Sequence, residues 1–198
     1  MNKIKLFILL LITSLVFISC QEKLPLDKDL TKKSYELINQ DSVKVNFPEV
    51  IKGHITVMGF IYTHCPDICP LTTNNMYLTE EKLKEQGIDD VKFVELSFDP
   101  DRDIPSVLKE FANIRGISFE DWMLLTGEKS IVEDLCKRFD VKAIKTDEEF
   151  NENGEPSYSM MHTDRISLID ENGILRKNYK GSTLNFDEII KDIKSLKD

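Results

Sequence analysis

The sequence predicts an α/β fold in which a central mixed β-sheet is flanked by helices and preceded by an N-terminal hairpin. Three observations lead to this prediction. Runs of β-branched and aromatic residues recur along the chain, segments with apolar residues at helical spacing separate them, and a hairpin signal precedes a last amphipathic helix. The length of 198 residues, with 41% hydrophobic and 31% charged residues, suits one domain with appendages.

Residues 1–19 are predicted to be a secretory signal that lies outside the fold. Lys3 and Lys5 form a positive start, and residues 6–18 form an apolar run of 13 residues, shorter than the ~20 residues that a membrane-spanning helix needs. The segment ends in Phe-Ile-Ser-Cys, which resembles the lipoprotein box of bacteria and implies a lipid on Cys20. We therefore expect a domain outside the cytoplasm, tethered to a membrane of the bacterial cell envelope; the alternative is an uncleaved anchor with Cys20 unmodified.

The polar segment 20–33 is expected to be a flexible tether, and residues 34–198 the folded domain. Because Lys3 and Lys5 leave with the signal, the formal net charge falls from −9 to −11. This acidic balance argues against nucleic acid as a partner, since nucleic-acid binders carry clustered Lys and Arg.

The first half of the domain begins with a hairpin, because residues 35–39 and 43–46 flank a polar Gln-Asp-Ser turn. Residues 54–62 are rich in β-branched and aromatic side chains, which is typical of a buried strand. Apolar residues at helical spacing follow. We expect this helix to open at Pro66 and to end at Gly87.

The second half alternates strands and helices and ends in a hairpin and a helix. Pro105 opens one helix, and Glu171-Asn172-Gly173 is a strong turn signal. The expected strands are 91–98, 122–126, 165–170 and 174–179, and the expected helices are 107–114, 131–139 and 186–196. A thioredoxin-like architecture fits this order of elements.

Cys65 and Cys69 lie where the first buried strand passes into the first long helix. With Pro66 at the first helical position, the two cysteines would share one helix face, one turn apart. The unpaired N–H groups and the helix dipole at such a terminus favour thiolates. Two such thiolates can close a disulfide or bind a soft metal, and Cu(I) favours thiolate pairs. A structural zinc site is disfavoured, because it needs four ligands and the chain has no second cysteine pair.

The chain has three histidines, His54, His64 and His162. A lone histidine is more often structural than a ligand, but a cysteine pair changes this weighing. Cu(II) prefers imidazole in addition to thiolates, so Cys65, Cys69 and His162 would accommodate both Cu(I) and Cu(II). The neighbouring Met160 and Met161 can add thioether ligands or fill the core.

Three blocks of the sequence resemble the Sco/SenC family of copper-binding, thioredoxin-like proteins. They are Gly-Phe-Ile-Tyr-Thr-His-Cys-Pro-Asp-Ile-Cys-Pro at 59–70, Ser-Phe-Asp-Pro-Asp-Arg-Asp-Ile-Pro at 97–105, and His-Thr at 162–163 followed by Leu-Ile-Asp and Asn-Gly. The blocks stand in the family's order, and the resemblance covers roughly residues 33–197. One departure is Asp-Arg at 164–165, where many members have apolar residues.

The resemblance implies that Cys65, Cys69 and His162 are copper ligands. It also implies that Asp99 is an aspartate near the metal that orients the site, and that Asp103 supports the same loop. Members of the family deliver copper to the CuA centre of cytochrome c oxidase or keep its cysteines reduced. The implied partner is therefore the copper-bearing subunit of that enzyme or another copper or thiol acceptor protein.

Other interpretations use the same residues. In a thiol–disulfide oxidoreductase, Cys65 would attack and Cys69 would resolve a mixed disulfide, with His162 dispensable. A peroxidase is less favoured, because the proline of the peroxiredoxin pattern is missing before Thr63. A passive envelope lipoprotein leaves the cysteine pair unexplained. Cys136 shares one helix face with apolar residues, so we expect it to fill the core, whereas Asp67 has a possible helix-capping role.

Overall fold

The computed structural model describes residues 24–150 and 156–197. Cys20 and the predicted signal at 1–19 therefore lie outside the described residues. The strands are β1 Lys28–Asp29, β2 Tyr35–Asn39, β3 Lys44–Phe47, β4 Ile55–Ile61, β5 Val91–Ser97, β6 Trp122–Thr126, β7 Ala143–Phe150, β8 Pro156–His162, β9 Ile166–Ile169 and β10 Ile174–Tyr179. The helices are the 3-10 turn η1 Glu49–Ile51, α2 Ile68–Lys84, α3 Pro105–Ile114, α4 Lys129–Arg138 and α5 Phe186–Lys197.

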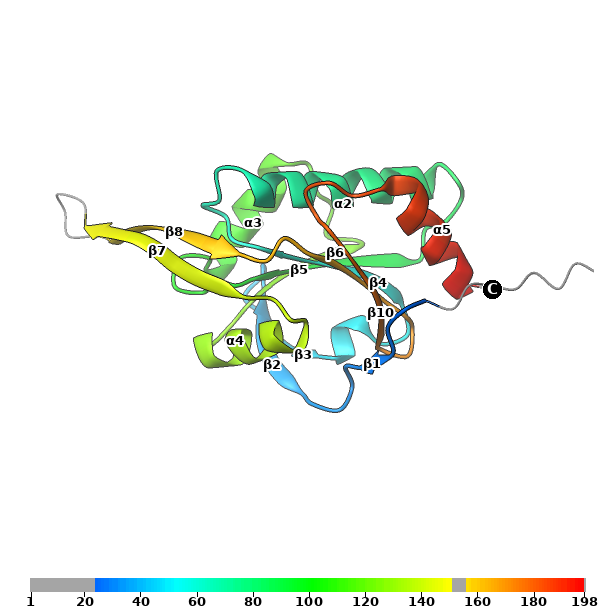
Figure 1. The fold of residues 1–198 in the computed structure, drawn as a ribbon, viewed down its shortest axis with the longest axis horizontal. Helices are drawn as coiled ribbons and strands as arrows, with labels where there is room; N and C mark the ends of the chain where they lie inside the picture. The colour runs from blue at the N-terminus through cyan, green and yellow to red at the C-terminus, as the bar shows by residue number, and fades with distance from the viewer. Residues whose placement is uncertain (1–23, 151–155, 198) are drawn as a thin grey trace, which may run out of the picture.

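A mixed eight-stranded sheet forms the body, in the order β1-β10-β9-β4-β5-β6-β2-β3. Strand β4 runs parallel to β5, and β5 parallel to β6, whereas β9 pairs with β4 in the antiparallel direction. Helices α2 and α5 cover one face of this sheet, and α4 lies on the other (Figure 1). The predicted central mixed sheet, flanking helices and N-terminal hairpin β2–β3 are all present.

The core explains why β4 occupies the centre. All seven residues of β4 are buried, as expected for a strand covered on both faces. On β4 itself, the ring of Phe60 packs 5.0 Å from that of Phe139, which in turn lies 6.1 Å from Phe47. Cys136 of α4 is buried among these apolar residues, in agreement with the expected core position.

The segment predicted as a flexible tether differs from the expectation over residues 24–33. Lys28–Asp29 pair with β10, and Leu30 is fully buried. Leu24 is buried as well, and Leu26 packs against the core. These leucines, spaced among charged residues, bury enough apolar surface to hold the segment on the sheet, so the packed fold includes residues 24–33 as well as those from 34 onward.

An arm formed by β7 and β8 has no counterpart in the predicted elements. The two strands pair with each other as a separate two-stranded sheet, and the arm projects from the body (Figure 1). The sequence of β7 lacks the apolar alternation of a half-buried strand, and Ile144 and Met161 remain 57% and 65% exposed. His162, the last residue of β8, stands at the base of the arm. Among the described residues no helix combines the length and the apolar character needed to cross a membrane.

Candidate metal centre

Three predicted ligands meet at one end of the sheet. The sulfurs of Cys65 and Cys69 and one ring nitrogen of His162 all lie within 4.8 Å of one another. His162 Nε2 is 3.6 Å from Cys69 Sγ and 4.0 Å from Cys65 Sγ. Within residues 24–150 and 156–197 this is the one cluster of three or more His, Cys, Asp or Glu side chains close enough to share a metal ion. The fold thus joins a strand–helix junction to the base of a distant hairpin.

Cys65 lies in the turn before α2, which begins at Ile68, so Pro66 is not the first helical residue. The N–H of Cys69 donates to Cys65 Sγ at 3.4 Å, and this sulfur accepts a bond from one of the unpaired amides of the first helical turn. Asp67 occupies the N-cap position, but its side chain makes no capping hydrogen bond, so the suggested capping role is not observed.

Cys69 is fully buried, and this overturns one expectation about its charge. Burial raises the pKa of the Cys69 thiol far above its usual range, although the N–H of Tyr62, which donates to Cys69 Sγ at 3.4 Å, acts in the opposite direction. Desolvation of the thiolate therefore outweighs the helix terminus. A bound metal ion would compensate the negative charge and favour the thiolate of Cys69.

The imidazole of His162 is held in a fixed orientation. Its Nδ1 lies 3.1 Å from the carbonyl oxygen of Thr163, a contact that suits a proton on Nδ1 and leaves Nε2 as the acceptor facing the sulfurs. The ring packs against both Tyr62 and Phe98, with centroids 5.8 Å and 4.8 Å away. This arrangement presents one lone pair to the two cysteines.

Asp103 holds the cysteine segment. Its buried carboxylate accepts bonds from the N–H of Thr63 at 2.9 Å, the hydroxyl of Thr63 at 2.6 Å and the hydroxyl of Ser97 at 2.6 Å. Burial raises the pKa of Asp103, and these hydrogen bonds oppose the rise. Because Thr63 lies two residues before Cys65, Asp103 fixes the turn that carries the first thiol.

Asp99 holds the histidine segment through Tyr158. The carboxylate accepts the Tyr158 hydroxyl at 2.7 Å and Arg102 Nε at 2.6 Å. Arg102 also donates to the carbonyl of Tyr158 at 3.1 Å, and its guanidinium lies 3.5 Å from the centre of the Tyr158 ring. We call Asp99, Arg102 and Tyr158 the clasp. Tyr158 stands four residues before His162 on β8 and on the same face of the strand, so the clasp positions the ligand strand.

Sequence reasoning missed Arg102 and Tyr158. A signal was present, because Arg102 lies inside the 97–105 block and Tyr158 has a strand-face spacing to His162. The other two histidines are exposed and lie outside the ligand cluster; His64 instead places Nδ1 3.1 Å from the Thr63 hydroxyl. Met161 lies on the opposite face of β8 from Met160 and is largely exposed.

Comparison with known proteins places these features in a family context. The sequence profile of the family described as SCO1/SenC matches residues 24–198. A SCO1/SenC family lipoprotein from Bacillus anthracis has a solved structure with a TM-score of 0.71 to this chain, at 34% identity, covering 88% of this chain and 98% of that one.

Two further solved structures match this chain over nearly all of their own length. BsSco, described with a disulfide switch and as a member of the Sco family of cytochrome c oxidase assembly proteins, has a TM-score of 0.70 at 30% identity and covers 88% of this chain and 98% of that one. Arabidopsis thaliana ScoI, solved with copper bound, has a TM-score of 0.70 at 26% identity and covers 83% of this chain and 97% of that one. These similarities confirm the predicted thioredoxin-like α/β fold.

Proposed function

The chain belongs to the SCO1/SenC family, and we propose that it is a membrane-tethered copper chaperone that delivers copper to the CuA site of cytochrome c oxidase or matures that site. The observation that carries the proposal is the cluster of two thiols and one imidazole within 4.8 Å. The copper-bound structure of the Arabidopsis relative and the membership of BsSco in a family of cytochrome c oxidase assembly proteins support it.

The donor set fits copper. Donor atoms that lie ~2.0–2.3 Å from one metal ion are ~3.5–4 Å apart, and His162 Nε2 lies 3.6 Å and 4.0 Å from the two sulfurs. Soft thiolates favour Cu(I), and an added imidazole suits Cu(II). Cys65 and Cys69 would hold the ion, and His162 would complete the site.

Copper loading also involves a proton. Because burial raises the pKa of Cys69, the thiol releases its proton as the ion binds, and affinity falls at lower pH. Transfer would proceed by exchange of these ligands for cysteines of the acceptor protein.

Membrane attachment through Cys20 is part of the proposal. It is supported by the lipoprotein box at residues 17–20 and by the description of the Bacillus anthracis relative as a lipoprotein. A tether confines the search for an acceptor to a membrane surface and raises the effective concentration. Cells fed radiolabelled palmitate should label the wild-type protein and not the Cys20→Ala variant; equal labelling would contradict this part.

Reduction of an acceptor's disulfide is the second candidate function, favoured by the two free thiols of one cluster. The Cys65 thiolate would attack one acceptor sulfur and expel the other as a thiolate, giving a mixed disulfide. Cys69, once deprotonated, would then displace the acceptor, leaving a Cys65–Cys69 disulfide and a reduced dithiol, a two-electron transfer. His162 has no necessary role in this reaction.

A copper titration separates the two functions. The reduced protein, the His162→Ala variant and the matched control His64→Ala are titrated with Cu(II) and followed by the thiolate-to-copper charge-transfer absorption. We expect the band to be lost or strongly shifted in His162→Ala and retained in His64→Ala, whose ring is outside the cluster. A band that is unchanged in His162→Ala would overturn the ligand assignment, and rapid disulfide reduction without tight copper binding would favour the reductase.

A further inference from the structure

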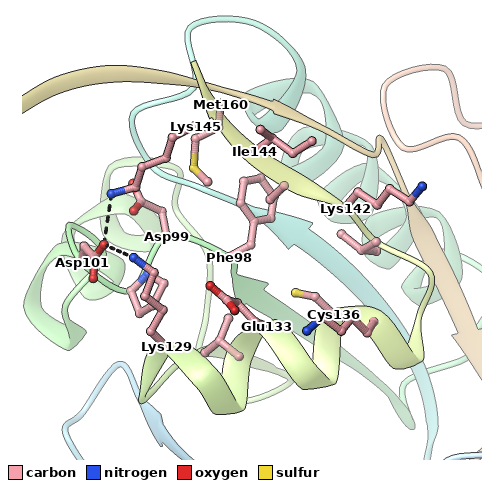
Figure 2. Close-up of a pocket in the computed structure, with 15 residues that line it drawn as sticks. Phe98, Asp99, Asp101, Lys129, Glu133, Cys136, Lys142, Ile144, Lys145 and Met160 are labelled. Carbon is pink, nitrogen blue, oxygen red and sulfur yellow. Dashed lines mark hydrogen bonds and ion pairs between the residues drawn. The ribbon is translucent and has the colours of Figure 1, made fainter. Parts of the chain in front are cut away.

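A cavity of about 420 Å³ lies beside the metal centre, between α4 and the base of the β7–β8 arm. Figure 2 shows Phe98 at its middle, with Cys136 of α4 and Ile144 of β7 on opposite sides. We call this cavity the pocket. Its volume is typical of sites that take a drug-sized molecule or one or two large side chains.

The interior of the pocket is apolar. Val132, Cys136 and Phe98 are buried residues at its floor, and Met160 closes one side. Ile144 borders the opening and is 57% exposed. An exposed apolar side chain next to an apolar cavity is a surface that gains from being covered.

The rim of the pocket is basic in an otherwise acidic protein. Lys129 and Lys145 both bind Asp101, at 2.8 Å and 3.1 Å, so one carboxylate serves two ammonium groups. Lys137 and Lys142 also line the pocket, and neither forms an ion pair with any other described residue.

Two acidic groups remain in the lining besides Asp101. Glu133 partly offsets the lysines, and Asp99 is neutralised by Arg102. The rim therefore carries a net positive charge although the whole chain carries −9. Since the Debye length at physiological ionic strength is ~8 Å, a partner in contact with the rim experiences these lysines more strongly than the distant acidic residues.

The pocket adjoins the metal centre, with Phe98 between the two. The ring of Phe98, at the floor, packs 4.8 Å from the ring of His162. Met160, on its side, lies two residues before His162 on β8. A side chain inserted into the pocket would contact Phe98, and the ring of Phe98 contacts His162, the ligand that completes the copper site.

We propose that the pocket is the docking site for the copper acceptor, which inserts a large apolar side chain flanked by carboxylates. The inference rests on the proposed function and names the chemistry of the acceptor's contact face. The apolar anchor covers Phe98 and Ile144, and the carboxylates pair with Lys137 and Lys142. Docking at this point brings the acceptor's cysteines to the side of the site where His162 lies.

The test uses the metal-free, reduced copper-bearing domain of cytochrome c oxidase from the same organism as the probe, at 0.15 M salt. Binding is followed by NMR on the isotope-labelled protein. We expect the signals of Ile144 and Cys136 to shift. The double variant Lys137→Glu/Lys142→Glu should weaken binding about tenfold, and the control Lys191→Glu/Lys194→Glu, with the same charge change on exposed residues of α5, should stay within about twofold.

A second pair of variants tests the apolar part. Ile144→Ser should weaken binding, whereas Ile114→Ser, at an even more exposed isoleucine at the end of α3, should not. Equal effects within either pair, shifts confined to other surfaces, or no binding of the probe would overturn the docking proposal. Copper titrations of all four variants should match the wild type, and a failure of the wild type to bind copper would instead contradict the proposed function.

Discussion

The two segments that supply the metal centre are held in different ways. The cysteine segment leaves a fully buried strand and is fixed by three hydrogen bonds to Asp103. The histidine segment belongs to an arm whose strands pair with each other, and the clasp joins it to the body. The cysteine segment is therefore anchored directly to the central strand, whereas the histidine segment is held by the clasp and by the packing of the His162 ring against Tyr62 and Phe98.

The strongest test of this contrast removes the anchor of the cysteine segment. Asp103→Ala leaves the N–H and hydroxyl of Thr63 and the hydroxyl of Ser97 without their acceptor. Each unpaired buried group costs ~1–3 kcal/mol, so we expect the free energy of unfolding in urea to fall by roughly 4 kcal/mol and copper binding to be lost. Asp103→Asn keeps an acceptor and should lose less. A stable Asp103→Ala protein with normal copper binding would show that the two segments do not differ in this way.

A second prediction concerns pH and the core behind the cysteine segment. Glu95 is fully buried on β5 and accepts the hydroxyl of Thr73, one turn after Cys69, at 2.7 Å. Its other oxygen has no partner among the described residues. Burial raises the pKa of Glu95 from 4.5 to about 7, so the folded protein holds this proton to a higher pH than the unfolded chain.

The sign of the pH effect follows from this shift. The stabilising contribution of protonated Glu95 is complete below pH 4.5 and is lost as pH rises towards 7, by ~3 kcal/mol in total. Urea unfolding of the wild type and Glu95→Gln at several pH values should show a decline from pH 5 to pH 8 that the variant lacks. Parallel pH profiles would contradict the prediction.

The clasp gives a smaller and more selective effect. Tyr158→Phe removes only the hydroxyl bond to Asp99, so the arm and His162 lose one anchor while the two thiols stay in place. We expect the affinity for Cu(II), which depends on the imidazole, to fall about tenfold, or ~1.4 kcal/mol, and the affinity for Cu(I) to fall less than threefold.

A matched control exists for this variant. Tyr179→Phe removes an equivalent buried bond, in which the Tyr179 hydroxyl donates to Asp192 at 2.7 Å, on strand β10. It should lower stability by a similar amount, ~1 kcal/mol, and leave the ratio of Cu(II) to Cu(I) affinity unchanged. A change of this ratio in both variants, or in neither, would mean that Tyr158 has no positioning role.

The smallest effect is expected at Lys145, whose ammonium lies 4.0 Å from the centre of the Tyr158 ring. This contact is partly exposed, and such cation–π pairs contribute ~0.5–1 kcal/mol. Lys145→Gln should therefore lower Cu(II) affinity by about twofold to fourfold, measured by competition with a chelator. A fall in Cu(II) affinity as large as that of Tyr158→Phe would mean that Lys145 supports the arm as strongly as the hydroxyl bond from Tyr158 to Asp99 does.

The sequence was informative where local pattern and burial agree. The β-branched run at 54–62 predicts the buried strand β4. The spacing of Cys65 and Cys69 predicts a thiol pair, and the family resemblance adds His162; the structure brings these three residues together. Asp99 and Asp103 were also identified as supporting residues, although their hydrogen-bond partners were not.

Other features depend on contacts that a single sequence does not display. Strand β7 of the arm has no apolar alternation, because among the described residues it pairs only with β8 and lies apart from the eight-stranded sheet. The protonation of Cys69 depends on how deeply α2 packs, and here burial outweighs the helix terminus. The leucines of residues 24–33 signal packing only once β10 is in place to receive them.

The packing of residues 24–33 limits how far the domain can extend from the membrane. If Cys20 carries the lipid, three residues separate it from the buried Leu24, and the four Cα–Cα steps between them span at most ~14 Å, whereas a free segment of 20–33 would span ~48 Å. Through β10 and β9, strand β1 is aligned with the first residues of β4. Strand β4 has seven residues and is therefore ~23 Å long, and Cys65 follows the opposite end of β4. Such a short connection would keep the metal centre within a narrow range of heights above the bilayer. Only an acceptor whose own copper site stands at a similar height could then reach the metal centre.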